Sequence, residues 1–198
     1  MRRIASIVTL CAVAALAAGC ASPPSYFYTL SAAAAPAATP AAAAKLSVVV
    51  GPVSIPAIVD LPQIVVSTGP NQVSIDEYNR WASPLQNNIS RVMAENLVAM
   101  LGTPRVSQFQ QSLNADADYR VAVEVQSFES APGEAAKLDA VWIVRRTKDG
   151  KAETGRTTVR EAVQDRSYGA LAAAHSRALA RMSRDIADTV TALDRGAR

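Results

Sequence analysis

Two segments of the chain carry hydrophobic residues at helical spacing. The first covers residues 85–101, where apolar side chains recur every three or four positions. Its start is marked by Ser83 as an N-cap, Pro84 at the first helical position and Gln86 as the partner in a capping box. Gly102 predicts its end. The shared apolar face consists of Leu85, Ile89, Val92, Met93, Leu97 and Met100.

The second segment predicts a longer helix, from about Tyr168 to Leu193. Its charged residues, such as Arg177 and Asp188, lie off an apolar stripe that follows the helical period. The stripe consists of Leu171, His175, Ala178, Leu179, Met182, Ile186, Val190 and Leu193.

The region before the first helix has the character of strands and ordered loops. Residues 46–50 form a largely apolar run that predicts a buried strand, closed by Gly51-Pro52. Residues 54–62 are apolar but interrupted by prolines, which indicates an irregular, ordered loop. Residues 63–68 and 71–75 are rich in β-forming residues and flank a Gly-Pro turn, so they predict a hairpin.

Three further strands are predicted between the helices. Residues 119–125 alternate between apolar and polar side chains, and Phe128 falls off this alternation, which predicts a bulge near Ser127. Residues 138–146 and 156–163 alternate in the same manner. Asp149-Gly150 between them is a hairpin turn signal.

This order of elements predicts an α+β fold, with a largely antiparallel sheet and two main helices packed on it. We expect three parts along the chain. Residues 1–19 form a lipoprotein signal peptide, and residues 20–44 form a lipid anchor, a short strand and an Ala/Pro-rich linker. Residues 45–198 form a single domain.

The first twenty residues have the pattern of a bacterial lipoprotein signal. Arg2 and Arg3 precede an uncharged, mostly apolar run over residues 4–18, which is too short to span a bilayer. Small residues then lead to Cys20, as in the lipobox, although Leu16 stands one place further from the cysteine than is usual. We therefore expect cleavage before Cys20 and lipidation of its thiol. The alternative is an ordinary signal peptide with an Ala-x-Ala-like cleavage site.

The residues after Cys20 indicate which membrane would hold the anchored protein. Ala21 stands where an Asp would retain an enterobacterial lipoprotein at the inner membrane, so we expect the periplasmic face of the outer membrane. Residues 26–30 are aromatic and strand-like, and predict either an edge strand docked on the domain or a stretch lying on lipid headgroups. We favour docking, which makes the Ala/Pro-rich residues 31–44 an internal loop.

Composition excludes several classes of function. The chain has 20 Lys and Arg against 17 Asp and Glu, and Arg2 and Arg3 are lost with the signal, so the mature charge is near neutral. Charges are mixed along the chain, which argues against nucleic acid as a partner. Cys11 also leaves with the signal, so no thiol remains for a disulfide or for catalysis.

No residue pattern predicts catalysis, a cofactor or a metal site. His175 is the only histidine, and its place in an apolar stripe predicts a packed core residue rather than a base or a ligand. No Gly-rich phosphate loop or nucleophile elbow is present. The sequence therefore predicts a protein that is not an enzyme and requires no cofactor.

Two features are candidates for a partner interface. Trp81 precedes the first helix, where it would either pin the entering loop or serve as an exposed anchor. The proline-stiffened loop with Ile55, Pro56, Leu61 and Pro62 is apolar and costly to expose. It would either meet a partner or a neighbouring subunit, or fold over the core of its own domain.

Several short blocks together resemble the ABC-type transport auxiliary lipoprotein family. After the lipobox these blocks are Tyr26-x-Tyr28-x-Leu30, Val53-x-Ile55-Pro56, Leu61-Pro62-Gln63-Ile64-Val65, Arg80-Trp81-Ala82-x-Pro84-Leu85 and Leu138-Asp139-Ala140-x-Trp142. The resemblance covers nearly all of the mature chain, and the block around Trp81 is the most specific. The insertion after Leu30 is longer than in the family pattern.

The resemblance implies a subunit of an MCE-type, Pqi-like intermembrane lipid transport system. Its partners would be an MCE-domain protein and an inner-membrane permease and ATPase complex, and a ring-like homo-oligomer would be compatible with this role. The rival interpretation is an envelope-stabilising or assembly-factor lipoprotein without a transport role.

Overall fold

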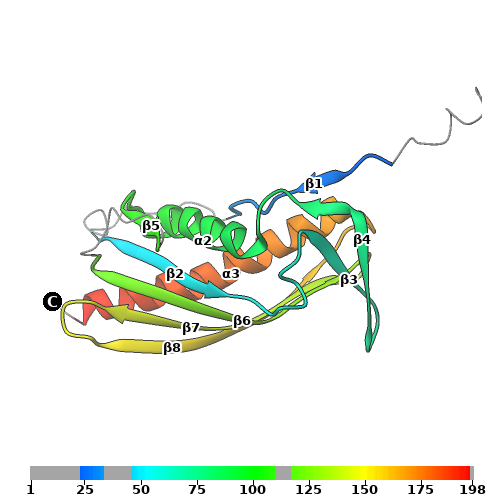
Figure 1. Ribbon diagram of the computed structural model, residues 1–198. Helices are drawn as coiled ribbons and strands as arrows, with labels where there is room; N and C mark the ends of the chain where they lie inside the picture. Colours follow the sequence, from blue (N-terminus) through cyan, green and yellow to red (C-terminus); the bar gives the residue numbers. More distant parts are fainter. Residues whose placement is uncertain (1–22, 34–45, 110–116, 197–198) are drawn as a thin grey trace, which may run out of the picture.

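The computed structural model describes residues 23–33, 46–109 and 117–196. Cys20, the predicted signal peptide and most of the Ala/Pro-rich stretch lie outside the described residues. Within them, two helices and two sheets form one α+β domain (Figure 1), which confirms the predicted fold class.

The larger sheet has five strands. β2 pairs in parallel with β5 on one side and β6 on the other, and β6, β7 and β8 continue as an antiparallel meander. The predicted bulge is confirmed, since the register of β6 against β7 shifts between Val125 and Ser127. In spatial order the strands are β5 (Val106–Gln108), β2 (Val48–Ser54), β6 (Tyr119–Ala131), β7 (Ala135–Arg146) and β8 (Ala152–Ala162).

The predicted hairpin is confirmed, but it belongs to a second sheet of three strands. β3 (Gln63–Gly69) and β4 (Gln72–Trp81) are antiparallel, and β1 (Tyr26–Tyr28) pairs in parallel with the far end of β4. β4 is longer than the sequence predicted, because its far end pairs with β1 on one side and, at Arg80, with Gln63 of β3 on the other. The small sheet lies at one end of the larger one, with β3 against β6 (Figure 1).

Helices α2 (Leu85–Leu101) and α3 (Tyr168–Arg195) cover one face of the five-stranded sheet (Figure 1). All but one of the apolar positions predicted for their faces are buried, and the exception, Met100, is half-buried against the same core. Gly102 ends α2 in the left-handed conformation, as predicted. The predicted packing of both helices is therefore confirmed.

The predicted capping box at the start of α2 is wrong. Pro84, not Ser83, occupies the cap position, with an extended ψ of 130° and no side-chain cap hydrogen bond. Gln86 is turned away from the helix end, and its Nε2 donates to the carbonyl oxygen of Val53 in β2. Because the Gln86 side chain bonds to β2, it is not available to cap the helix.

The prediction that Gly51-Pro52 closes the first strand is also wrong. β2 continues to Ser54, and its register against β6 shifts between Val50 and Val53. Proline lacks an N–H group and is tolerated at such an irregularity. Gly51 has a φ of 128°, and a Cβ there would lie 2.8 Å from Cβ of Phe109, so the close approach of this segment requires glycine.

A buried tryptophan connects the meander to α3. Trp142 of β7 lies across its cross-strand partner Gly155, and its indole N–H donates to Oγ1 of Thr157 at 3.0 Å. The Thr157 hydroxyl donates in turn to Oδ2 of Asp185 on α3 at 2.6 Å. The indole occupies the space above Gly155 so closely that a Cβ there would lie 2.2 Å from the ring.

We predict that Gly155→Ala destabilises the domain by about 1–3 kcal/mol, because an added methyl group would overpack the site and displace the indole. Urea unfolding followed by circular dichroism measures this change. Gly69→Ala is the matched control, since its Cβ would meet only Gln72, at an ordinary 3.8 Å. Equal stability of the two variants would contradict the prediction.

His175 is a packed core residue, as the sequence predicted. It is fully buried on α3, and its ring stacks on Phe128 with centroids 3.7 Å apart. Its Nε2 lies 2.8 Å from Oγ of Ser130, and its Nδ1 has no partner among the described residues. Burial lowers the pKa of His175 from 6.5 to about 3, so the ring is neutral in the folded state at neutral pH.

We predict that the free energy of unfolding falls as pH decreases below about 6.5. The unfolded state then binds a proton at His175 that the folded state rejects until about pH 3. Between pH 7 and pH 5 this loss amounts to about 2 kcal/mol. Denaturant unfolding of the wild type and of His175→Gln should show the difference, because the carboxylates contribute equally to both. Parallel stability curves for the two proteins would refute the prediction.

Candidate functional site

The segment that follows β1 is tied into the domain by both helices. Leu30 is fully buried, and its carbonyl oxygen accepts a hydrogen bond from Nη2 of Arg91 on α2. The backbone N–H of Ser31 donates to Oγ of Ser176 on α3, and that of Ala33 donates to Oδ1 of Asn96 on α2, both at 3.1 Å. Residues 28–33, here called the strap, therefore dock on the domain, as we favoured.

A network of aromatic and polar side chains holds β1 against β4 and the start of α3. The Tyr28 hydroxyl donates to Oδ1 of Asn79 at 2.8 Å, and the ring of Tyr28 lies 5.9 Å from that of Tyr168. The Tyr168 hydroxyl donates to Oδ2 of Asp76 at 3.1 Å. Hydrogen bonds from the backbone N–H of Tyr78 and the side chain of Asn79 hold the pKa of Asp76 below its usual value. Burial, followed by the hydrogen bond to Asp76, raises the pKa of Tyr168 to about 12.

The loop over residues 55–62 combines both arrangements that the sequence left open. Ile55, Val59 and Leu61 pack against the core of the domain. Ile58 is 58% exposed, and Pro62 is exposed as well. The loop is ordered by a hydrogen bond from Val59 N to the carbonyl oxygen of Pro56 at 3.0 Å. It therefore covers the core with one side and presents Ile58 to solvent with the other.

Trp81 is placed in the pinning arrangement rather than on the surface. Its side chain is buried, and its ring meets Phe128 edge-on, with centroids 6.4 Å apart. Its backbone N–H donates to the carbonyl oxygen of Pro62 at 2.8 Å. Trp81 thus connects the end of β4 to the end of the 55–62 loop and packs on the core beneath that loop through Phe128.

An apolar groove lies between this loop, the β3–β4 hairpin and the bulge of β6. Its volume is about 170 Å³. An adjoining cleft of about 790 Å³ shares Ile58 and Val73 with the groove and is also lined by charged residues of both signs. Pro56, Ile58, Val59, Val65, Val73 and Phe128 line the groove, and the charged residues of the cleft are Lys137, Arg160, Arg166, Glu129 and Glu134, of which Lys137 pairs with Glu129.

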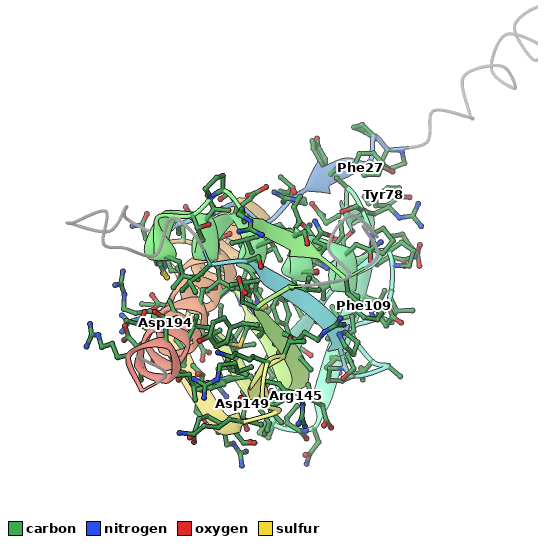
Figure 2. All side chains as sticks on the ribbon, turned by 90° about the vertical axis from the view of Figure 1, so that its left-hand side faces the viewer. Phe27, Tyr78, Phe109, Arg145, Asp149 and Asp194 are labelled. Carbon is green, nitrogen blue, oxygen red and sulfur yellow. The ribbon has the colours of Figure 1, made fainter. Side chains whose placement is uncertain are left out.

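Large exposed hydrophobic side chains gather at this end of the domain. Among the described residues, six of the seven belong to β1, β4 or the 55–62 loop, and the seventh is Phe109 beside β2. Figure 2 shows Phe27 and Tyr78 close together, away from Phe109. The six are Tyr26, Phe27, Ile58, Val73, Ile75 and Tyr78. The sequence did not predict the exposure of Val73, Ile75 and Tyr78 on β4. The alternation of Val73 and Ile75 with polar residues is the signal that indicates a strand with one solvent-exposed face.

The small-sheet end of the domain offers surfaces for contact. The described part of the chain holds no cluster of three or more His, Cys, Asp or Glu residues that could bind a metal ion. None of its helices combines the length and the apolar character that crossing a membrane requires. The candidate contact site is therefore the small-sheet end of the domain, which carries the strap, the apolar groove and the exposed apolar residues.

Comparison with known proteins agrees with the resemblance found in the sequence. The structure is similar to a crystal structure of an uncharacterised protein (TM-score 0.69, 20% identity), which aligns over 85% of this chain and 99% of the other. It is also similar to a Xanthomonas campestris protein of the DUF330 family (TM-score 0.68, 20% identity), over 87% of this chain and 100% of the other. At this identity the likeness shows the fold alone.

No curated protein sequence matches the chain. The model of one protein family matches residues 28–187, from the start of the strap to the last turns of α3. Because this match covers most of the sequence, the chain belongs to the family of ABC-type transport auxiliary lipoprotein components.

Proposed function

We propose that the protein is an outer-membrane lipoprotein on the periplasmic face, and a non-enzymatic docking subunit of an MCE-type, Pqi-like lipid transport system. Its membership of a transport auxiliary lipoprotein family supports the transport role. The observation that carries the proposal is the strap, which ties the segment just after Cys20 firmly to the folded domain. An anchor at Cys20 would therefore hold the domain itself rather than a loose tail.

The anchor acts through lipidation of Cys20. Each buried CH₂ group contributes about 0.8 kcal/mol, and two or more acyl chains together give stable attachment. Only five residues, 21–25, separate Cys20 from β1. The domain would therefore stay next to the leaflet that holds its acyl chains.

The 55–62 loop and the apolar groove form the docking surface in this proposal. A lipid that crosses the periplasm needs a path that shields its acyl chains from water. Ile58 and the groove present apolar surface beside a cleft with a polar, charged lining, which suits contact with an MCE-domain protein. That protein would connect to an inner-membrane permease and ATPase complex, and further copies of this chain in a ring would enlarge the docking surface.

We predict that the mature N-terminus is an acylated Cys20. Mass spectrometry of the purified protein should find Cys20 first, with the added mass of a diacylglyceryl group, and fractionation should find the protein in the outer membrane. Cys20→Ala should lose both properties, whereas Ala21→Asp should keep the acyl group and move the protein to the inner membrane. A bare thiol, or a terminus at another residue, would refute the anchor.

We predict that Ile58→Asp weakens copurification with an MCE-domain protein at least about tenfold, because the interface would bury a carboxylate without a partner, which costs several kcal/mol. Copurification in mild detergent measures the effect. Phe109→Asp is the matched control, since Phe109 is similarly exposed at 54% but lies outside the docking surface. Equal recovery with both variants would remove the loop from the interface. Failure of the wild type to copurify would favour an envelope-stabilising lipoprotein.

A further inference from the structure

Three exposed aromatic side chains flank the point where the chain enters the domain. Tyr26 is 55% exposed, Phe27 64% and Tyr78 42%. Phe27 is the cross-strand partner of Arg80, so Phe27, Arg80 and Tyr78, two positions before Arg80, share one face of the small sheet. Figure 2 shows Phe27 and Tyr78 together, where β1 lies beside β4. We call Phe27, Tyr78 and Arg80 the aromatic face; Tyr26, which pairs with Asn79, lies on the opposite side of β1.

The aromatic face is held in a fixed position. β1 is bonded to β4, and the backbone N–H of Ala82 donates to the carbonyl oxygen of Tyr28 at 2.8 Å. The backbone of Tyr78 is fixed because its N–H donates to Oδ1 of Asp76 at 2.8 Å. Tyr28 and Leu30 of the same segment turn inward, so the outward position of Phe27 is not a consequence of a loose strand.

The length of the tether limits what can cover this face. Five residues separate Cys20 from Tyr26, and an extended chain spans at most about 3.3–3.6 Å per residue. The start of β1 therefore lies within roughly 20 Å of the anchored cysteine. The polar headgroup layer occupies about 5–8 Å on each side of the hydrocarbon core. A lipid-anchored Cys20 thus keeps the aromatic face within reach of the headgroups at all times.

The chemistry of the face suits a phospholipid surface. Tyrosine and other amphipathic aromatic rings prefer the headgroup level of a bilayer, and arginine binds phosphate. Among the described residues Arg80 forms no ion pair, and its buried Nε has no hydrogen-bond partner. Two carboxylates lie nearby and neither pairs with Arg80: Asp76 accepts hydrogen bonds from Tyr78, Asn79 and Tyr168, and Glu77 accepts one from Gln63.

We propose that the aromatic face rests on the phospholipid headgroups of the leaflet that holds Cys20. This proposal depends on the lipid anchor of the proposed function, but not on any transport partner. The anchor alone would leave the domain free to turn on its tether. Contact through the aromatic face adds a second attachment point, and thereby sets which side of the domain faces the membrane.

The test uses the full mature chain, acylated at Cys20 and reconstituted into vesicles of phosphatidylethanolamine and phosphatidylglycerol. Cys20 is the only cysteine of the mature sequence, so a second cysteine gives a single labelling site. Phe27→Cys and Tyr78→Cys are each labelled with an environment-sensitive fluorophore. Phe109→Cys is the matched control, because Phe109 is an equally exposed aromatic away from β1 and β4.

We expect the probes at positions 27 and 78 to shift their emission to shorter wavelength in vesicles and to lose intensity to headgroup-labelled quencher lipids. The probe at position 109 should do neither. Equal behaviour of all three probes in acylated protein would overturn the proposal. A shift that grows with protein density and is insensitive to quencher lipids would overturn it too, and would assign the face to a second copy of the chain.

Folding and acylation are checked independently. Arg80→Cys, whose position pairs with Phe27, provides another labelling site on the face if one of the other variants fails to fold by circular dichroism. Since the vesicles contain no MCE-domain protein, failure of the docking function leaves the expected result unchanged. A chain that carries no acyl groups at Cys20 would overturn both proposals, and mass spectrometry of the same sample detects that case.

Discussion

The domain depends on the insertion of Leu30 and its neighbours against α2 and α3. Leu30 is fully buried, and the backbone on either side of it would lose its hydrogen bonds to water without replacements. The helices supply these replacements through Arg91, Asn96 and Ser176. These polar side chains therefore serve the strap, which makes the first residues of the folded chain part of the core.

This insertion explains why otherwise unfavourable residues lie in the helix faces. Asn96 and Ser183 are fully buried, and burial of an unpaired amide or hydroxyl group costs free energy. Asn96 accepts from the strap through Oδ1 and donates to Oγ of Ser183 through Nδ2. The interface between α2 and α3 is thus partly polar because it has to hold a third segment of backbone.

In the proposed mechanism, the strap would link the membrane anchor to the docking groove. β1 enters beside the aromatic face, and Tyr28 connects through Asn79 and Asp76 to the start of α3. From β4, Trp81 contacts Phe128 and the end of the 55–62 loop. A continuous set of packed side chains therefore runs from β1 to the groove, so that in the proposed mechanism a fixed orientation at the membrane would also orient the groove.

The sequence by itself determined the elements whose pattern is local. The helical stripes, the alternating meander, the bulge near Ser127 and the turn at Asp149-Gly150 all follow from side-chain periodicity or turn chemistry within about ten residues. The buried state of His175 also followed from its place in such a stripe. Tertiary structure alone decided where segments distant in sequence meet. The side chain of Gln86 donates to the carbonyl oxygen of Val53 instead of capping its own helix. β4 pairs with β1, which lies about fifty residues away in the sequence. These contacts depend on the packing of the whole core, so no local pattern encodes them, and the exposure of Phe27 and Tyr78 follows from them.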